Sequence, residues 1–232
     1  MKTKDHVLLT EWLLEHQGKE LPAGFAAGFR FGSVLPDYNP FTYLRGIIGI
    51  GRGKPHGHNA EVTRHKVIML IKRFRKKAGS GYLNGLYIGT VIHYIADAFT
   101  YPHHDYYPGT LSDHVAYEWS LHRSFAGYLR GISGTSRTTE RVPACCPDCV
   151  SGEGLEDFEY FFDKMLRLYR VEDKNEYTDC RFITFMCSYV FENAVIKLLG
   201  NEPQNSMTVK CRELADAFAK DLPGLSHKRQ EI

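Results

Sequence analysis

The sequence predicts an all-α protein, a single-domain multi-helix bundle of roughly seven to nine helices. Three observations support this fold class. Hydrophobic residues recur with helical rather than alternating spacing in almost every long segment. No stretch has the pattern of two strands joined by a tight turn. No internal repeat divides the 232 residues, so one domain over residues 1–232 is expected.

The segments with helical spacing give the expected elements in order. They cover residues 6–16, 59–77, 82–100, 110–129, 155–170, 176–199 and 207–220. Residues 82–100 are apolar almost all round, so this helix should lie in the centre. Thr110 and Asp113 form a short capping box at the start of the next helix, which should end before Gly131. Residues 133–154, rich in Gly, Ser and Thr, are expected to form a flexible surface insert.

The composition is that of an ordinary globular protein. Hydrophobic residues make up 43% and charged residues 24% of the chain. The net charge of +2 predicts neither nucleic acid nor an anionic membrane as a partner. One basic stripe stands out within residues 59–77, and we interpret it as a solvated helix face. Attraction to phosphate-bearing substrates or lipid headgroups is the alternative. The stripe comprises Arg64, His65, Lys66, Lys72, Arg73, Arg75, Lys76 and Lys77.

The N-terminal segment does not read as a signal peptide, and no window approaches 18 uninterrupted apolar residues. We therefore expect a cytoplasmic protein. In that reducing compartment the six cysteines are thiols by default. Cys146 and Cys149 have C-x-x-C spacing, but no second pair lies nearby to complete a zinc site. Together with Cys145 they are interpreted as loop thiols, with redox sensitivity as the alternative.

The densest chemistry lies in the segment HYIADAFTYPHHDYYPGTLSDHVAYE. His93 and Asp97 are four residues apart, as are His114 and Glu118, so each pair shares one face of a helix. Imidazole nitrogen and carboxylate oxygen are good zinc ligands. The first pair lies in an apolar helix, where polar groups without partners are costly. With His103 between the two pairs, the segment predicts a metal site.

The pattern H-x3-D-x5-H-x10-H-x3-E resembles the zinc-dependent phospholipase C family, which shares its fold with the S1/P1-type nucleases. HYIADAFTYPHH resembles the family's helix-then-His motif, and SDHVAYE resembles its later H-x3-E motif. GSVLPDYNP resembles the segment that carries a ligand aspartate, here Asp37. The resemblance covers roughly residues 1–125.

The resemblance implies a cluster of two or three Zn²⁺ ions. The first ion would be held by Asp37, His58, His93 and Asp97, and the second by His103, His114 and Glu118. Asp97 would bridge to a third ion bound by His6 and the N-terminal amine and carbonyl. His56 is the alternative to His58, and His65 competes with both because the spacing from Asp37 is long. His56, His104 and His122 are candidates for contacts with the ligands, and Asp37 is the candidate general base.

The sequence thus predicts a zinc-dependent phosphodiesterase of phospholipase C type. Its substrate would be a phospholipid or a related phosphodiester, with transient contact to a membrane surface and no stable nucleic-acid partner. Two alternatives stay open. One is an S1/P1-like nuclease for single strands. The other is a non-catalytic helical binding protein whose structural zinc has a closed coordination sphere.

Overall fold

The computed structural model describes residues 1–16, 20–38, 60–76, 81–134 and 155–199. These ranges contain seven α-helices, one short 3-10 helix and no strand, which confirms the all-α prediction. The predicted helix at 207–220 and most of the predicted insert at 133–154 lie outside the described residues. The elements are α1 (Thr3–His16), α2 (Ala23–Tyr38), α4 (Ala60–Lys76), α5 (Tyr82–Ala98), η1 (Tyr101–His103), α6 (Leu111–Gly134), α8 (Leu155–Val171) and α9 (Glu176–Leu199).

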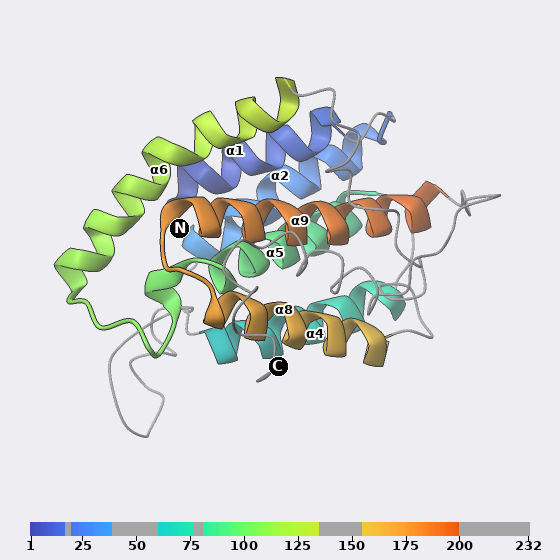
Figure 1. Ribbon diagram of the computed structural model, residues 1–232. Helices are drawn as coiled ribbons and strands as arrows, with labels where there is room; N and C mark the ends of the chain where they lie inside the picture. Colours follow the sequence, from blue (N-terminus) through green and yellow to red (C-terminus); the bar gives the residue numbers. More distant parts are fainter. Residues whose placement is uncertain (17–19, 39–59, 77–80, 135–154, 200–232) are drawn as a thin grey trace.

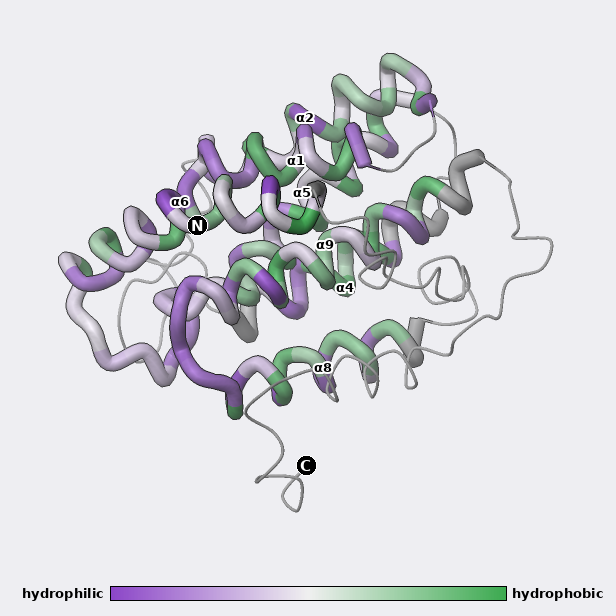
Figure 2. Tube along the Cα trace, turned by 45° about the horizontal axis from the view of Figure 1, so that its top comes forward, coloured by the Kyte–Doolittle hydropathy of each residue, from purple (hydrophilic) through white to green (hydrophobic). Residues whose placement is uncertain are grey.

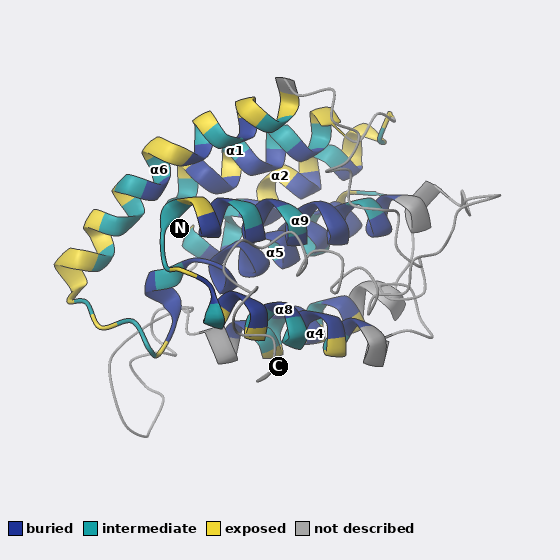
Figure 3. Ribbon diagram, viewed as in Figure 1, coloured by how far each residue is buried: buried dark blue, intermediate teal, exposed yellow. Residues whose placement is uncertain are grey.

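Helix α5 is central, as its apolar sequence predicts. It contacts α1, α2, α4 and α9. In Figure 1, α5 and α9 run between α1, α2 and α6 on one side and α4 and α8 on the other. Buried residues are concentrated on α5 and α9, whereas α6 exposes its outer face (Figure 3). Every residue from Val91 to Ala98 is buried, so the C-terminal half of α5 lies wholly inside the protein.

Helix α2 is the element that helical spacing did not predict. It contains several glycines and Pro36, which are poor helix formers. Its glycines lie against the backbone of α5. A Cβ atom on Gly32 would be 2.2 Å from the carbonyl oxygen of Leu86, and one on Gly85 would be 2.0 Å from that of Phe25. The two helices therefore approach at backbone distance, which only glycine permits, and this contact offsets the low helix propensity of α2.

The register of this contact makes α2 and α5 parallel. Gly85 faces Phe25, Gly89 faces Phe29, and the ring of His93 bonds to the carbonyl oxygen of Ser33. The residue numbers rise together on both helices, so their C-terminal ends meet at one end of the bundle. Polar residues carried by the last turns of both helices are thereby brought together.

Helix α8 is amphipathic and packs through one apolar face, which Figure 2 shows as recurring green bands. That face consists of Phe158, Phe161, Phe162, Met165 and Leu168, all fully or almost fully buried. Its acidic residues meet the basic stripe of α4. Arg64 bonds to both carboxylate oxygens of Asp163, and Lys72 Nζ lies 3.4 Å from Glu159. Part of the basic stripe thus binds α8 rather than facing solvent alone. The side chains of Arg73, Arg75, Lys76 and Lys77 lie outside the part of the chain that the structure describes.

Helix α6 begins as predicted and ends later than predicted. The backbone N–H of Thr110 donates to Asp113 Oδ2 at 2.8 Å, and that of Asp113 donates back to Thr110 Oγ1 at 3.3 Å. The helix continues through Gly131 to Gly134. Ile132 packs against the core, and Ser133 Oγ accepts a hydrogen bond from Trp12 Nε1 at 2.9 Å. These contacts outweigh the low helix propensity of one glycine.

The thiols of Cys180 and Cys187 are buried and free. Cys145, Cys146 and Cys149 lie outside the described residues. None of the described helices is both long and apolar enough to cross a membrane.

The contact between α2 and α5 predicts the effect of one methyl group. Gly32→Ala should lower the free energy of unfolding by about 3 kcal/mol or more, since its Cβ would overlap the backbone of Leu86. The control is Gly127→Ala on α6, where a Cβ meets nothing within 4 Å. Alanine there should raise stability by about 0.5–1 kcal/mol. Urea unfolding of both variants measures the difference, and equal stabilities would contradict the close packing.

Candidate metal centre

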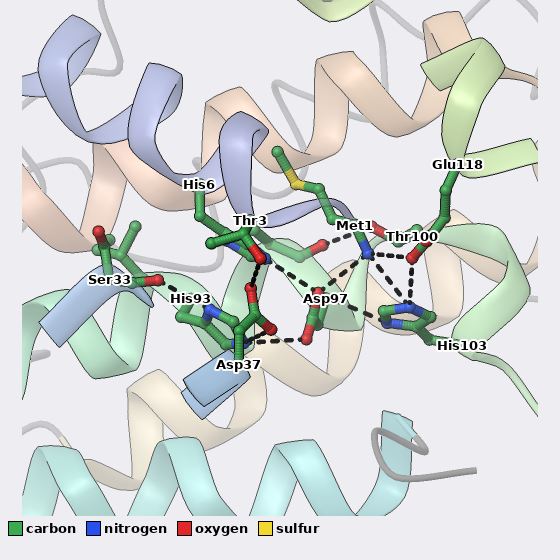
Figure 4. Close-up of polar contacts among 12 residues, drawn as sticks. Met1, Thr3, His6, Ser33, Asp37, His93, Asp97, Thr100, His103 and Glu118 are labelled. Carbon is green, nitrogen blue, oxygen red and sulfur yellow. Dashed lines mark hydrogen bonds and ion pairs between the residues drawn. The ribbon is translucent and has the colours of Figure 1, made fainter. Parts of the chain in front are cut away.

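Asp97 lies at the centre of the polar cluster at the C-terminal end of α5 (Figure 4). Its side chain is only 2% exposed. Oδ2 lies 3.3 Å from His93 Nε2, and Oδ1 lies 3.4 Å from His6 Nε2 and 3.6 Å from His103 Nδ1. These distances are longer than the usual 2.9 Å or so of a direct hydrogen bond. One buried carboxylate thus faces histidines from three different segments of the chain.

The orientation of His93 is fixed by the backbone of α2. Its Nδ1 lies 2.8 Å from the carbonyl oxygen of Ser33. A carbonyl oxygen only accepts, so Nδ1 must be the donor and a neutral ring has its lone pair on Nε2. Nε2 faces Asp97 at 3.3 Å and Asp37 at 3.6 Å. In the neutral ring, three electron-pair donors point toward one another, an arrangement that a cation between them stabilises.

The first possible ligand group consists of His6, Asp37 and His93. One ligand atom from each lies within 4.8 Å of the others. The rings of His6 and His93 stack with their centroids 3.9 Å apart. Asp37, in the last turn of α2, accepts a hydrogen bond from Thr3 Oγ1 at 2.7 Å through Oδ2, which leaves Oδ1 toward His93. Helices α1, α2 and α5 each supply one member.

The second possible ligand group consists of His103, His114 and Glu118, again with ligand atoms within 4.8 Å of one another. His103 ends η1, and the other two lie one turn apart on α6. Glu118 Oε1 is 3.3 Å from His114 Nε2 and 3.4 Å from His103 Nε2. The capping box at Thr110 starts the helix just before His114, so it fixes the position of this first turn.

The amine of Met1 lies between the two groups. Its nitrogen is 2.8 Å from Glu118 Oε1, 3.3 Å from Asp97 Oδ1 and 3.2 Å from His103 Nε2. Burial disfavours the charged amine, but Asp97 and Glu118 outweigh burial and raise its pKa to about 10. A positive charge is therefore held at the point where the two groups meet.

The electrostatics of the centre favour a bound cation. Burial opposes ionisation of Asp97, but the Met1 ammonium and the neighbouring histidines hold its pKa well below the usual range. Burial, followed by the neighbouring Met1 ammonium, lowers the pKa of His103 to about 4. Burial and then the charge of His93 lower the pKa of His6. His6 and His103 are thus neutral at pH 7, the form that binds metal.

The donor set fits zinc. Each group offers two imidazole nitrogens and one carboxylate, the ligand types and number found in open zinc sites. Asp97 lies between the groups: Oδ2 faces His93, and Oδ1 faces both His6 of the first group and His103 of the second. The C-terminal ends of α2 and α5 add negative partial charge to the same region, which further favours a cation.

The structure brings together seven of the eight residues expected to bind metal: His6, Asp37, His93, Asp97, His103, His114 and Glu118. His58, the eighth, and its alternative His56 lie outside the described residues. The grouping differs in one respect from the expected one. His6, expected at a third ion with the N-terminus, has its ring against His93 and belongs to the first geometric group.

His104 and His122 lie next to the centre without joining either ligand group. The ring of His104 stacks on Tyr106 and lies against Tyr169. His122 Nδ1 lies 2.5 Å from Oδ1 of Asp5, a buried carboxylate at the start of α1. This contact joins α6 to the turn of α1 that carries His6.

Sequence reasoning missed two buried carboxylates near the centre, Asp5 and Asp179. Both are fully buried. Their hydrogen-bond partners lie on other elements and include His122 for Asp5 and Tyr117 for Asp179. Neither aspartate has a histidine four residues away. Local spacing could therefore not find them; only an assignment of α1 and α9 as buried helices would have marked these acidic residues as unusual.

One of three comparisons with known proteins finds a match. The sequence model of the family described as zinc dependent phospholipase C matches residues 5–179. This range contains every residue of both ligand groups. Comparison with curated proteins finds no significant match, and neither does comparison with solved structures.

The burial of His104 predicts a pH dependence of stability. Burial, followed by the charge of His103, lowers its pKa to about 4 from the ordinary 6.5. The unfolded chain then binds a proton at higher pH than the folded chain. The stabilisation is full above pH 6.5 and is lost as the pH falls toward 4. His104→Gln should reduce this loss by an amount on the order of 3 kcal/mol, the energy equivalent of the shift.

Urea unfolding of wild type and variant at several pH values between 7 and 4 measures this difference. His16→Gln is the control, because His16 is exposed. It should leave the pH dependence unchanged. Parallel curves for wild type and His104→Gln would contradict a buried, neutral His104.

Proposed function

Since the chain belongs to the zinc-dependent phospholipase C family, we propose that it is a zinc-dependent phosphodiester hydrolase of phospholipase C type. Its substrate is a phospholipid or a related phosphodiester. It uses two or three zinc ions held by the two ligand groups and Asp97. The observation that carries the proposal is the convergence of two three-residue ligand groups on one buried carboxylate.

Each proposed ion has its own set of ligand residues. His6, Asp37 and His93 would hold one ion, and His103, His114 and Glu118 would hold another. Asp97 would lie between the two positions, since its oxygens are 3.3 Å from His93 and 3.6 Å from His103. The proximity of the Met1 nitrogen to Asp97 supports a third position shared with His6. Bound zinc supplies a Lewis acid for phosphate oxygens and lowers the pKa of water.

Asp37 is the candidate proton acceptor. Thr3 holds Oδ2 by a hydrogen bond of 2.7 Å, and Oδ1 faces the cluster. Asp37 is partly exposed, unlike Asp97, so water can reach it. A carboxylate in this position can take a proton from a water that attacks the phosphorus. Asp37 lies in the last turn of α2, and the close packing of α2 against α5 fixes the position of its carboxylate.

One feature of the surface favours a lipid over a nucleic acid as the substrate. Leu111, Val115 and Trp119 are 77%, 45% and 50% exposed and recur every fourth residue along α6. His114 and Glu118 precede Val115 and Trp119 by one position, so this apolar stripe borders the second ligand group. Lys2 Nζ lies 3.6 Å above the Trp119 ring. An apolar stripe with an aromatic and a cation supports transient contact with a membrane surface.

Metal content is the first test. Protein dialysed against metal-free buffer should keep two or three zinc ions per chain, measured by mass spectrometry of the metal. Asp97→Asn should lose at least one of them, because it removes the charge that the two positions share. His16→Ala removes an exposed histidine and should keep the wild-type content. Less than one ion per wild-type chain would refute the proposal.

Hydrolysis is the second test. Asp37→Asn preserves an oxygen ligand but cannot take up a proton. Assayed in excess zinc, so that the weaker amide ligand is also loaded, this variant should show a fall in kcat of about 100-fold or more. The assay compares a choline phosphodiester with a single-stranded oligonucleotide. Faster zinc-dependent turnover of the oligonucleotide would indicate a nuclease. No turnover of either substrate by zinc-loaded wild type would indicate a binding protein with structural zinc.

A further inference from the structure

Asp179 is a fully buried carboxylate that joins four elements. It lies in the first turn of α9. Oδ1 accepts a hydrogen bond from the hydroxyl of Tyr169, on α8, at 2.5 Å. Oδ2 accepts two, at 3.0 Å each, from the backbone N–H of Tyr101 and from the hydroxyl of Tyr117. These two donors belong to η1 and to α6.

Both donors on Oδ2 lie next to residues of the second ligand group. Tyr101 opens η1, the three-residue helix that ends at His103. Tyr117 immediately precedes Glu118 and lies three residues after His114 on α6. One oxygen atom therefore ties together the two segments that must approach for His103, His114 and Glu118 to share an ion. The linking segment, residues 104–110, contains no α-helix that could fix this approach.

Because the carboxyl group of Asp179 is buried, it needs all of its hydrogen-bond donors. Burial raises the pKa of Asp179 to about 7, while the three donors act in the opposite direction. A buried carboxyl group without these donors would be destabilising. All three must therefore be held in place, and this requirement gives the network its rigidity. The tyrosine rings lie in the same cluster: Tyr101 is in edge contact with Tyr117, and Tyr169 with Phe99.

We propose that Asp179 is a positioning residue for the second metal position, because it sets the separation of η1 and α6 through Tyr101 and Tyr117. The inference rests on the proposed function, since it assigns a metal ion to His103, His114 and Glu118. The three hydrogen bonds of Asp179 come from Tyr101, Tyr117 and Tyr169, neighbours of the ligands in the chain or members of another helix, rather than from the ligands. Its loss should widen the second group while the first group, built on α1, α2 and α5, keeps its geometry.

The experiment measures zinc affinity by competition with a chromogenic chelator. The wild type should release its zinc to the chelator in separate phases, one for each metal position. Asp179→Ala should weaken the affinity of one phase by about 10-fold or more, the usual effect of losing a residue that supports metal ligands. The affinity of the other phase should stay as in the wild type. Asp179→Asn retains one acceptor oxygen, so its zinc affinity at the second position should lie between those of the wild type and Asp179→Ala. Tyr117→Phe removes a single donor from Oδ2 and should weaken the same phase by a smaller factor.

Two backgrounds identify the affected position. In a His114→Ala background the second group is already incomplete, so adding Asp179→Ala should leave the affinity for the remaining zinc unchanged. In a His6→Ala background the same addition should still weaken zinc binding at the second group. This non-additivity separates a role at the second position from a general effect on the fold.

Asn193→Ala is the control for general destabilisation of α9. Asn193 is buried further along the helix and donates to the carbonyl oxygen of Tyr189 at 2.7 Å. This variant should lower stability and change neither zinc phase. The inference is overturned if Asp179→Ala leaves both phases unchanged, or if it weakens both phases equally. If Asp179→Ala fails to fold, unchanged zinc phases in Tyr117→Phe overturn it instead.

The failure of this inference can be told apart from the failure of the proposed function. Wild-type protein that binds no zinc would contradict both the positioning role and the proposed function. Wild-type protein that binds zinc and hydrolyses the phosphodiester, with Asp179→Ala unchanged in both respects, sinks only the positioning role.

Discussion

The rest of the centre depends on the contact between α2 and α5 at backbone distance. Glycines on both helices remove the side chains that would separate them, so the register is set by main-chain atoms that cannot repack. That register places the carbonyl oxygen of Ser33 against His93 and the last turn of α2 beside the last turn of α5. Asp37 thus owes its position relative to His93 and Asp97 mainly to a contact between the backbones of α2 and α5.

The same contact concentrates negative charge inside the protein. Two helices end at one place with their C-terminal partial charges, and Asp37, Asp97 and Glu118 gather there. The amine of Met1 lies beside Asp97 and Glu118, which outweigh its burial and raise its pKa to about 10. Buried carboxylates without a counter-charge would destabilise the fold. A bound zinc ion, as proposed, would add to the counter-charge that Met1 supplies, and its binding would then contribute to the stability of the fold.

Local patterns were sufficient wherever the determining contacts are local. Periodicity predicted α4, α5, α6, α8 and α9, because their apolar faces are continuous in the sequence. Spacing of four residues predicted the pairs on α5 and α6, because one helical turn brings their members together. Helix α2 could not be found in this way, since its glycines favour a helix only once α5 lies against them. Asp5 and Asp179 were missed because partners that join them to other elements, His122 and Tyr117, lie 117 and 62 residues away.

The two ligand groups are made rigid by different physical means. The first is carried by three long helices: backbone contact aligns α2 with α5, and the hydrogen bond from Thr3 to Asp37 joins α1 to them. The second joins a three-residue helix, η1, to the first two turns of the long helix α6, and η1 is too short to be held by helix packing. Hydrogen bonds take over this role, with Asp179 holding η1 to α6 and Asp5 holding α6 to α1. Such bonds need every donor in place, whereas a packed glycine contact needs only shape. The geometry of the second group, and with it the distance between the two proposed metal positions, therefore depends on residues that would not touch the metal.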